Sequence, residues 1–176
     1  LGQLTAIGLD RKLNERGLRK TQEVARRALQ KHSHENMVES VLAELPEALN
    51  MPLTGIWKHR PARQGLEPVA VTDRSERLFG DPPSFSDGDS LAWRSFETNS
   101  TLVTGNVASH PDVYNPETPI EQEVIVPIGD FGVLIAGSTY AESFGDLDVE
   151  MLESLATNLE AVAEVIDSRQ DLDLLN

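Results

Sequence analysis

The sequence contains no cysteine among its 176 residues. Disulfide bonds, thiolate metal sites, cysteine nucleophiles and thioether-linked chromophores are therefore excluded. No stretch approaches the roughly 18 consecutive apolar residues of a membrane-spanning helix, and no basic-then-apolar leader is present. We therefore expect a cytoplasmic protein without membrane contact. Because the chain also lacks an initial Met, we expect it to be an excerpt of a longer protein.

Basic side chains are scarce in the second part of the chain. Residues 78–176 hold 2 Lys and Arg against 19 acids, whereas residues 1–77 hold 13 against 10. The two parts carry −17 and +3, which add up to the net charge of −14. A surface of this sign repels phosphate backbones. We therefore expect no direct nucleic-acid contact by this segment.

The common catalytic and metal-binding motifs are also missing. The sequence has no glycine-rich phosphate loop, no Gly-x-Ser-x-Gly elbow and no His-Glu-x-x-His helix. His32 and His34 are two positions apart, which places them about 200° apart around a helix and prevents them from sharing one ion. We therefore predict no catalytic residue and no metal ligand.

The hydrophobic pattern predicts antiparallel strands between terminal helices. In chain order we expect a helix at 10–31, a helix at 33–49, strands at 53–59 and 66–71, a loop at 73–90 with one helical turn, a short helix at 91–98, a strand at 101–104, an irregular segment at 105–119, strands at 123–128 and 132–138, and a helix at 146–167. This order indicates an α+β fold in which helices cover one sheet face, with loops and a short helix on the other.

The last helix carries an apolar seam at spacings of three and four. Its positions are Leu152, Leu155, Leu159, Val162 and Ile166. Such a seam favours dimerisation, with packing onto the domain's own sheet as an equally weighted alternative. This helix follows the strand hairpin directly in the chain. We therefore expect it to transmit a change in the packing of the sheet to a neighbouring domain, as a shift between two conformations.

A weaker seven-residue spacing in the first helix predicts a coiled-coil-like linker over residues 1–32. Its positions are Leu4, Ile7, Leu18, Thr21, Ala25 and Ala28.

The paired strands at 123–128 and 132–138, followed by Phe144, Asp146, Asp148 and the segment 152–156, resemble the end of a GAF domain. The resemblance spans about residues 33–168 and implies a GAF-like (PAS-like) antiparallel sheet. It leaves 169–176 as the start of a C-terminal linker.

A closer resemblance is to the GAF domain of bacterio-opsin activator-like regulators of halophilic archaea. It rests on the segments 66–73, 78–83, 88–93, 112–119 and 133–138. Arg outnumbers Lys 11 to 4 in an acidic chain, a balance that is similar to that of haloarchaeal proteins. The resemblance implies a preceding PAS sensor and a following helix-turn-helix domain, which would carry any DNA contact.

GAF domains that attach bilins or reduce methionine sulfoxide use cysteines, and cyclic-nucleotide binders carry an Asn-Lys-x-Phe-x-Asp-Glu pattern; this chain has neither. The resemblance still implies a small-molecule pocket between the sheet and the loops at 73–119. The cofactor and the ligand stay unknown. The candidate contacts are Trp57, Trp93, Arg94, Phe96, His110, Asp112, Tyr114 and Ser138.

The resulting hypothesis is a non-catalytic sensory domain of a transcription regulator, homodimeric through its flanking helices. One alternative is a purely structural dimerisation module, which predicts a pocket filled by side chains. Another is a cryptic hydrolase or reductase, which predicts buried groups with strongly shifted pKa values in one cleft.

Overall fold

The elements of the fold follow the expected order. The computed structural model describes residues 2–86, 88 and 90–175, and describes side chains from residue 11 onward. The elements are α1 (Gly2–Ala28), α2 (His34–Ala48), β1 (Thr54–Arg60), the 3-10 helix η1 (Pro61–Arg63), β2 (Gly65–Val71), α3 (Asp73–Phe79), β3 (Phe85–Ser86), α4 (Leu91–Thr98), β4 (Leu102–Gly105), the 3-10 helix η2 (Val107–Ser109), β5 (Gln122–Ile128), β6 (Gly132–Ser138) and α5 (Asp146–Leu175).

The strands form one antiparallel sheet in the order β3-β2-β1-β6-β5-β4. Two hairpins, β1–β2 and β5–β6, are joined side by side through the pairing of β1 with β6. Gly129 closes the second hairpin at φ +48°, a conformation that favours glycine. A Cβ on Gly132 would lie 1.9 Å from the carbonyl oxygen of Trp57, so the central strand pair requires glycine at this position.

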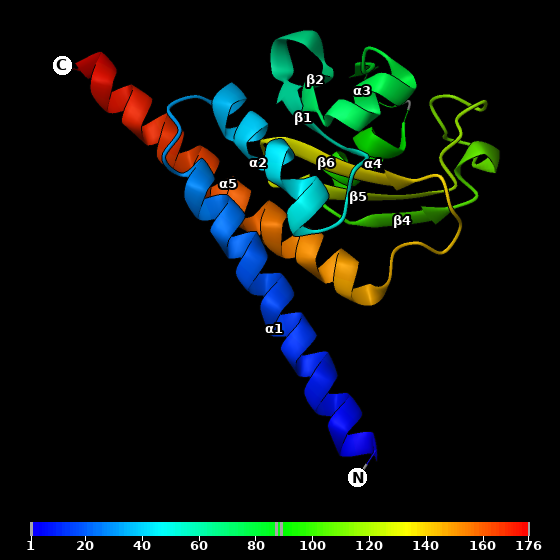
Figure 1. The fold of residues 1–176 in the computed structure, drawn as a ribbon. Helices are drawn as coiled ribbons and strands as arrows, with labels where there is room; N and C mark the ends of the chain where they lie inside the picture. The colour runs from blue at the N-terminus through cyan, green and yellow to red at the C-terminus, as the bar shows by residue number, and fades with distance from the viewer. Residues whose placement is uncertain (1, 87, 89, 176) are drawn as a thin grey trace.

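Alternation along the strands divides the interior into two layers. Ile56, Val124 and Leu134 are fully buried on the face covered by α2 and α5. Trp57 and Ile125 point to the opposite face, where α4 and the long loops lie. The expected α+β arrangement, with terminal helices on one face and loops plus a short helix on the other, is confirmed (Figure 1).

The two terminal helices run side by side (Figure 1). They approach closely at Gly17, where a Cβ would lie 2.3 Å from the sulfur of Met151. Further along, Arg169 Nη1 donates a hydrogen bond of 2.6 Å to the carbonyl oxygen of Leu29. Both helices therefore run in the same direction, and the start of α1 and the end of α5 lie far apart at opposite ends of the pair.

The apolar seam of α5 lies inside the chain's own core. Its five residues, Leu152, Leu155, Leu159, Val162 and Ile166, are each at most 6% exposed. They pack in one cluster with residues of the sheet, α1 and α2. Of the two expectations for this helix, dimerisation and packing onto the domain's own sheet, the seam follows the second. In α1, Thr21, Ala25 and Ala28 are buried as well, while the side chains of Leu4 and Ile7 lie outside the described residues.

Several elements differ from the expectation. The first helix begins at Gly2 rather than residue 10, and the last continues to Leu175 rather than 167, because no proline or glycine follows residue 167 to stop it. The segment expected as a loop at 73–90 contains α3 and β3. Two acids in the first turn of α3, Asp73 and Glu76, suit the positive end of the helix dipole.

Candidate functional site

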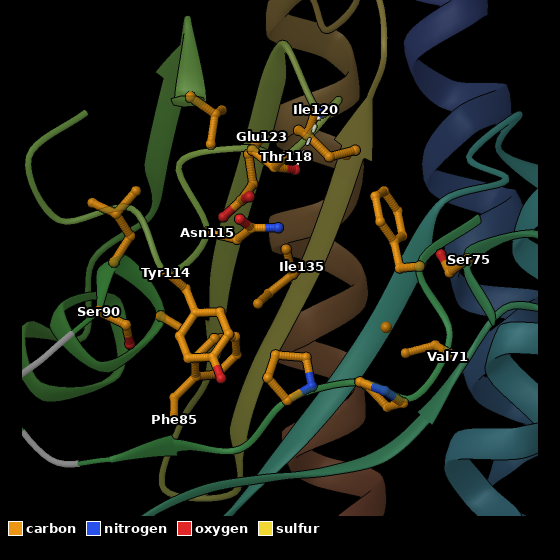
Figure 2. A pocket seen from close by; sticks show the side chains of 18 of the residues that line it. Val71, Ser75, Phe85, Ser90, Tyr114, Asn115, Thr118, Ile120, Glu123 and Ile135 are labelled. Carbon is orange, nitrogen blue, oxygen red and sulfur yellow. Dashed lines mark hydrogen bonds between the residues drawn. The ribbon is translucent and has the colours of Figure 1, made fainter. Parts of the chain in front are cut away.

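A cavity of about 480 Å³ lies on the sheet face opposite α2 and α5 (Figure 2). Residues of β1, β5 and β6 form its floor, and the segments 79–85 and 112–120 form its walls. The start of α4 closes one side, where the Ser90 hydroxyl caps the helix by accepting a hydrogen bond from Trp93 N. The volume lies in the range of small-molecule sites. The cavity is open, whereas a purely structural module predicted one filled by side chains.

One wall of the cavity is aromatic. The indole of Trp57 lies 5.5 Å from the ring of Phe85, and Phe85 meets Tyr114 edge-on at 5.4 Å. Trp57 Nε1 donates a hydrogen bond of 2.8 Å to the carbonyl oxygen of Pro83, which attaches the 79–85 wall to β1. Tyr114 remains 61% exposed and lies at the mouth. This surface suits the flat or apolar part of a ligand.

One ionisable group on the floor of the cavity is the carboxyl of Glu123 (Figure 2); Asp81 and Asp112 belong to its walls. Glu123 lies on β5, on the same face as Ile125, and is paired with Gly137 of β6. The side chain of Ile120 packs over Gly137, where a Cβ would lie 3.0 Å from Ile120 Cδ1. Burial raises the pKa of Glu123 to about 7. Near neutral pH, the protonated and the ionised forms of Glu123 are therefore both populated.

Two polar side chains of the 112–120 wall lie beside Glu123 (Figure 2). Asn115 Oδ1 accepts a hydrogen bond of 3.0 Å from Glu117 N, and Thr118 N donates one of 3.1 Å to the carbonyl oxygen of Asn115. The hydroxyl of Thr118 accepts from Ile120 N at 3.2 Å. These local bonds form a turn that presents an amide and a hydroxyl next to the carboxyl.

An ion pair joins this wall to α4. The guanidinium of Arg94 contacts the carboxylate of Asp112, with the two side chains 51% and 37% exposed. Asp112 N also donates a hydrogen bond of 3.0 Å to His110 Nδ1. The loop is thus connected to the helix beside the cavity by a solvent-accessible contact.

Three of the predicted ligand contacts line the cavity, namely Trp57, Asp112 and Tyr114. Five do not line it: Trp93, Arg94, Phe96, His110 and Ser138.

The direction of α4 and the strand alternation explain these positions. Leu91 and Ala92 take the cavity-facing positions of α4, so Trp93 and Phe96 instead stack with His59 at 5.8 and 4.6 Å. Arg94 and His110 bind Asp112 outside the cavity, as described above.

Ser138 follows the cavity-lining Gly137 and therefore belongs to the opposite face of the strand. Its hydroxyl donates to Ser143 Oγ at 2.7 Å.

Glu123, Asn115 and Phe85 are site residues that the sequence reasoning missed. A signal for Glu123 was present: an acid at the start of an apolar strand, in phase with Ile125, is directed toward the same face as that buried residue. Asn115 and Phe85 carry no such signal, because their positions depend on how two loops fold over the sheet.

Other kinds of site find little support. Within residues 2–86, 88 and 90–175, no group of three or more His, Asp or Glu is placed to hold a metal ion. In the same residues, no helix combines the length and the apolar composition needed to cross a membrane.

The sequence profile of the GAF domain matches residues 31–163. No curated protein sequence matches the chain. Among solved structures, similarity is found to a free methionine-R-sulfoxide reductase from Neisseria meningitidis in complex with its substrate, with a TM-score of 0.73, 20% identity, and coverage of 85% of this chain and 89% of that one. The GAF domain of a phosphoenolpyruvate-protein phosphotransferase from Coxiella burnetii gives a TM-score of 0.76 at 16% identity, covering 90% and 98%. A methyl-accepting chemotaxis protein gives 0.66 at 15% identity, covering 85% and 98%.

These neighbours overturn the prediction of a non-catalytic regulator. The same fold carries an enzyme, a reductase of free methionine sulfoxide, as well as signalling domains, so the fold gives no ground for excluding catalysis. At these identities the likeness concerns the fold alone. The absence of cysteine still removes thiol chemistry from this chain, so any reaction here would use other groups.

Proposed function

Because the chain belongs to the GAF domain family, we propose that its cavity binds a small amphipathic molecule with a protonated nitrogen directed at Glu123. The observation that carries this proposal is the Glu123 carboxyl, with a pKa of about 7, on the floor of a cavity whose lining is largely apolar and aromatic. A cation beside this carboxyl would stabilise its charged form and lower its pKa. The apolar part of the ligand would then lie against Trp57 and Phe85.

Matched pairs of probes test the charge preference. 3-Phenylpropylamine and 3-phenylpropanoic acid have the same apolar skeleton and opposite charges. The amine should raise the melting temperature of the wild-type protein in a concentration-dependent way, and Glu123→Gln should abolish the effect. Glu121→Gln is the matched control, because Glu121 lies two residues away and is exposed. Stabilisation by the acid, or equal amine binding by Glu123→Gln, would contradict the proposal.

Proton linkage gives an independent readout. If an amine lowers the pKa of Glu123, binding at pH 6.5 must release a proton from the carboxyl. Calorimetry in buffers of different ionisation enthalpy should then give different apparent binding enthalpies for the wild-type protein and equal ones for Glu123→Gln. Buffer-independent enthalpies for the wild-type protein would show that the ligand does not meet this carboxyl.

A second candidate function is proton-transfer catalysis by Glu123. A carboxyl with a pKa close to neutral is suited to both accepting and donating a proton near pH 7. The cryptic-enzyme alternative predicted several buried groups with strongly shifted pKa values in one cleft, and the cavity provides one group with such a shift, Glu123. The test is deuterium incorporation into carbon-bound hydrogens of ligands that bind, followed by NMR in heavy water. Exchange that requires Glu123 supports the candidate, and exchange at the same rate in Glu123→Gln excludes it.

We further propose that the chain is of the bacterio-opsin activator-like subtype and acts inside the cell in transcription regulation. The five segments quoted for that resemblance support the subtype, and the parallel terminal helices are suited to connecting neighbouring domains in series. Sequencing the gene on both sides of this segment is the test. A PAS domain before it and a helix-turn-helix domain after it are expected, and unrelated neighbours would refute the subtype.

We also propose a homodimer through the flanking helices. Because the seam of α5 is used inside the chain, the interface must use other apolar residues of these helices. Among the described side chains of the two helices, the large exposed ones are Leu13, Val165, Leu172, Leu174 and Leu175. Light scattering should give twice the chain mass, and replacing Leu172, Leu174 and Leu175 by Asp should give a monomer. Tyr140→Asp, at an exposed turn, is the control. A monomeric wild-type protein would contradict the proposal.

A further inference from the structure

A second cluster of reactive groups lies on the helix-covered side of the sheet, where α2, β1 and α5 meet. Lys58 Nζ is 2.8 Å from His34 Nδ1. On the other side of the same ring, His34 Nε2 is 2.8 Å from Asp167 Oδ1. An amine, an imidazole and a carboxylate are therefore arranged in series, outside the cavity that contains Glu123.

The two nitrogens of His34 face different partners. For Nδ1 to accept a hydrogen bond or a proton from the amine of Lys58, the ring proton of neutral His34 must be on Nε2. His34 Nε2 lies within ion-pair distance of Asp167 Oδ1 but has no hydrogen-bond partner among the described residues. The contact is therefore electrostatic rather than a well-aligned hydrogen bond. Asp167 would stabilise an imidazolium through its charge.

The surroundings act on the pKa of the Lys58 amine in both directions. The ring of Phe131 meets His34 edge-on at 5.1 Å and lies 5.8 Å from Lys58 Nζ, a cation–π contact that stabilises the ammonium form. Burial, followed by the nearby positive charge of Arg60, lowers the pKa of Lys58. The carboxylates of Glu35 and Asp167 act in the opposite direction with smaller effect. The other lysines, Lys12, Lys20 and Lys31, are exposed.

We propose that Lys58 is a nucleophilic lysine that is acylated by acyl thioesters, with His34 as the base and Asp167 as the group that stabilises the protonated base. The geometry follows the nucleophile, base and orienting-group pattern of covalent catalysis. The proposal concerns a modification site and does not depend on what occupies the cavity.

The proposed acylation transfers an acyl group from the sulfur of the thioester to Lys58 Nζ. The lone pair of neutral Lys58 Nζ attacks the thioester carbonyl carbon, and a C–N bond forms. A proton of Nζ passes to His34 Nδ1, whose positive charge faces Asp167. The C–S bond then breaks, the thiolate leaves with the electron pair, and the proton on His34 is released to the thiolate or to water. The products are an amide at Lys58 and a free thiol, with no change of oxidation state.

Lysine mapping on the full chain tests the proposal. The protein is incubated with acetyl-CoA at pH 8, and acetylation at each of the four lysines is followed over time by peptide mass spectrometry. Lys58 should be acetylated faster than Lys12, Lys20 and Lys31 although it is less exposed. The three exposed lysines are internal controls for intrinsic amine reactivity. Acetylation of Lys58 at or below their rate would overturn the proposal.

Two variants test whether His34 assists the reaction of Lys58 or whether the surroundings only leave the amine accessible. His34→Gln should slow acetylation of Lys58 by about 100-fold, the lower end of what a positioned base contributes, without changing the other lysines. His32→Gln is the matched control, because His32 is exposed and two residues away. If His34→Gln fails to fold, Asp167→Asn serves instead, since Asp167 is 56% exposed, with Asp171→Asn as its control. An unchanged rate in the folded variant would overturn the proposal.

Discussion

Arg94 of α4 and Asp112 of the 112–120 wall form an ion pair beside the cavity mouth. The sequence reasoning selected both residues as ligand contacts, and the structure instead joins them to each other. Because Asp112 also lines the cavity, the pair links the position of the wall to that of the helix.

Breaking this pair should loosen the wall without unfolding the domain. Asp112→Asn is expected to change the free energy of unfolding by about 1 kcal/mol or less, because the pair is solvent-accessible. Backbone amides of residues 110–118 should exchange faster in hydrogen-exchange mass spectrometry. Arg63→Gln, which removes an exposed pair with Glu67, is the control and should leave this segment unchanged. Unaltered exchange in Asp112→Asn would show that local turns alone hold the wall.

Glu123 should make the stability of the domain fall as the pH rises. Its folded-state pKa of about 7 lies above the ordinary value of 4.5, so between these values the folded chain keeps a proton that the unfolded chain has released. The free energy of unfolding therefore decreases through this window, by about 3 kcal/mol at most, and the effect is complete above pH 7. Glu123→Gln should match the wild-type protein near pH 4 and exceed it at pH 8 in urea unfolding. A pH-independent difference would rule out this titration.

The indole hydrogen bond of Trp57 should contribute measurably to stability. Trp57→Phe keeps an aromatic ring but leaves the carbonyl oxygen of Pro83 without its donor, at an expected cost of about 1 kcal/mol in urea unfolding beyond the change in ring size. Trp93→Phe is a matched comparison, because Trp93 Nε1 has no hydrogen-bond partner among the described residues. A larger loss in Trp93→Phe than in Trp57→Phe would contradict this assignment.

Glycine should be required at position 132 and replaceable at position 105. In Gly132→Ala the new methyl group would meet the carbonyl oxygen of Trp57, so the β1–β6 pairing must separate, and we expect a loss of several kcal/mol or failure to fold. Gly105 lies at the end of the edge strand β4, and no described atom beyond its chain neighbours lies within 4 Å of the position that a Cβ would take there. Gly105→Ala should therefore change the melting temperature little, and a comparable loss in both variants would refute the argument.

Truncation of the α5 seam should destabilise the single chain. Leu159 is fully buried, and Leu159→Ala is expected to cost about 2–5 kcal/mol through lost burial and a residual cavity. Leu78→Ala, at a side chain of α3 that is 48% exposed, should change the unfolding midpoint far less. The measurement should be repeated at several protein concentrations. A loss that disappears at low concentration would place the seam in an interface between chains instead.

The helices and strands with strong periodicity were predictable, and the candidate site was predictable only in part. The apolar run around Val124 and Ile125 predicts the strand β5. It does not show which residue faces the helices and which the cavity, because both are apolar and both are buried. Ser90 as a helix cap also follows from local chemistry. Trp93 and Tyr114 looked equivalent as aromatic candidates, yet only Tyr114 lines the cavity, because the rotation of α4 and the course of a loop have no local signal.

By itself, the sequence determined the α+β class, the antiparallel hairpins, the terminal helices and the exclusion of thiol chemistry. These follow from periodicity, turn residues and composition, which act over a few residues. Only the tertiary structure decided that the α5 seam is buried in the chain, that Glu123 has a shifted pKa, and that Lys58, His34 and Asp167 meet. Burial and proximity depend on residues far apart in the chain, and no local pattern specifies them.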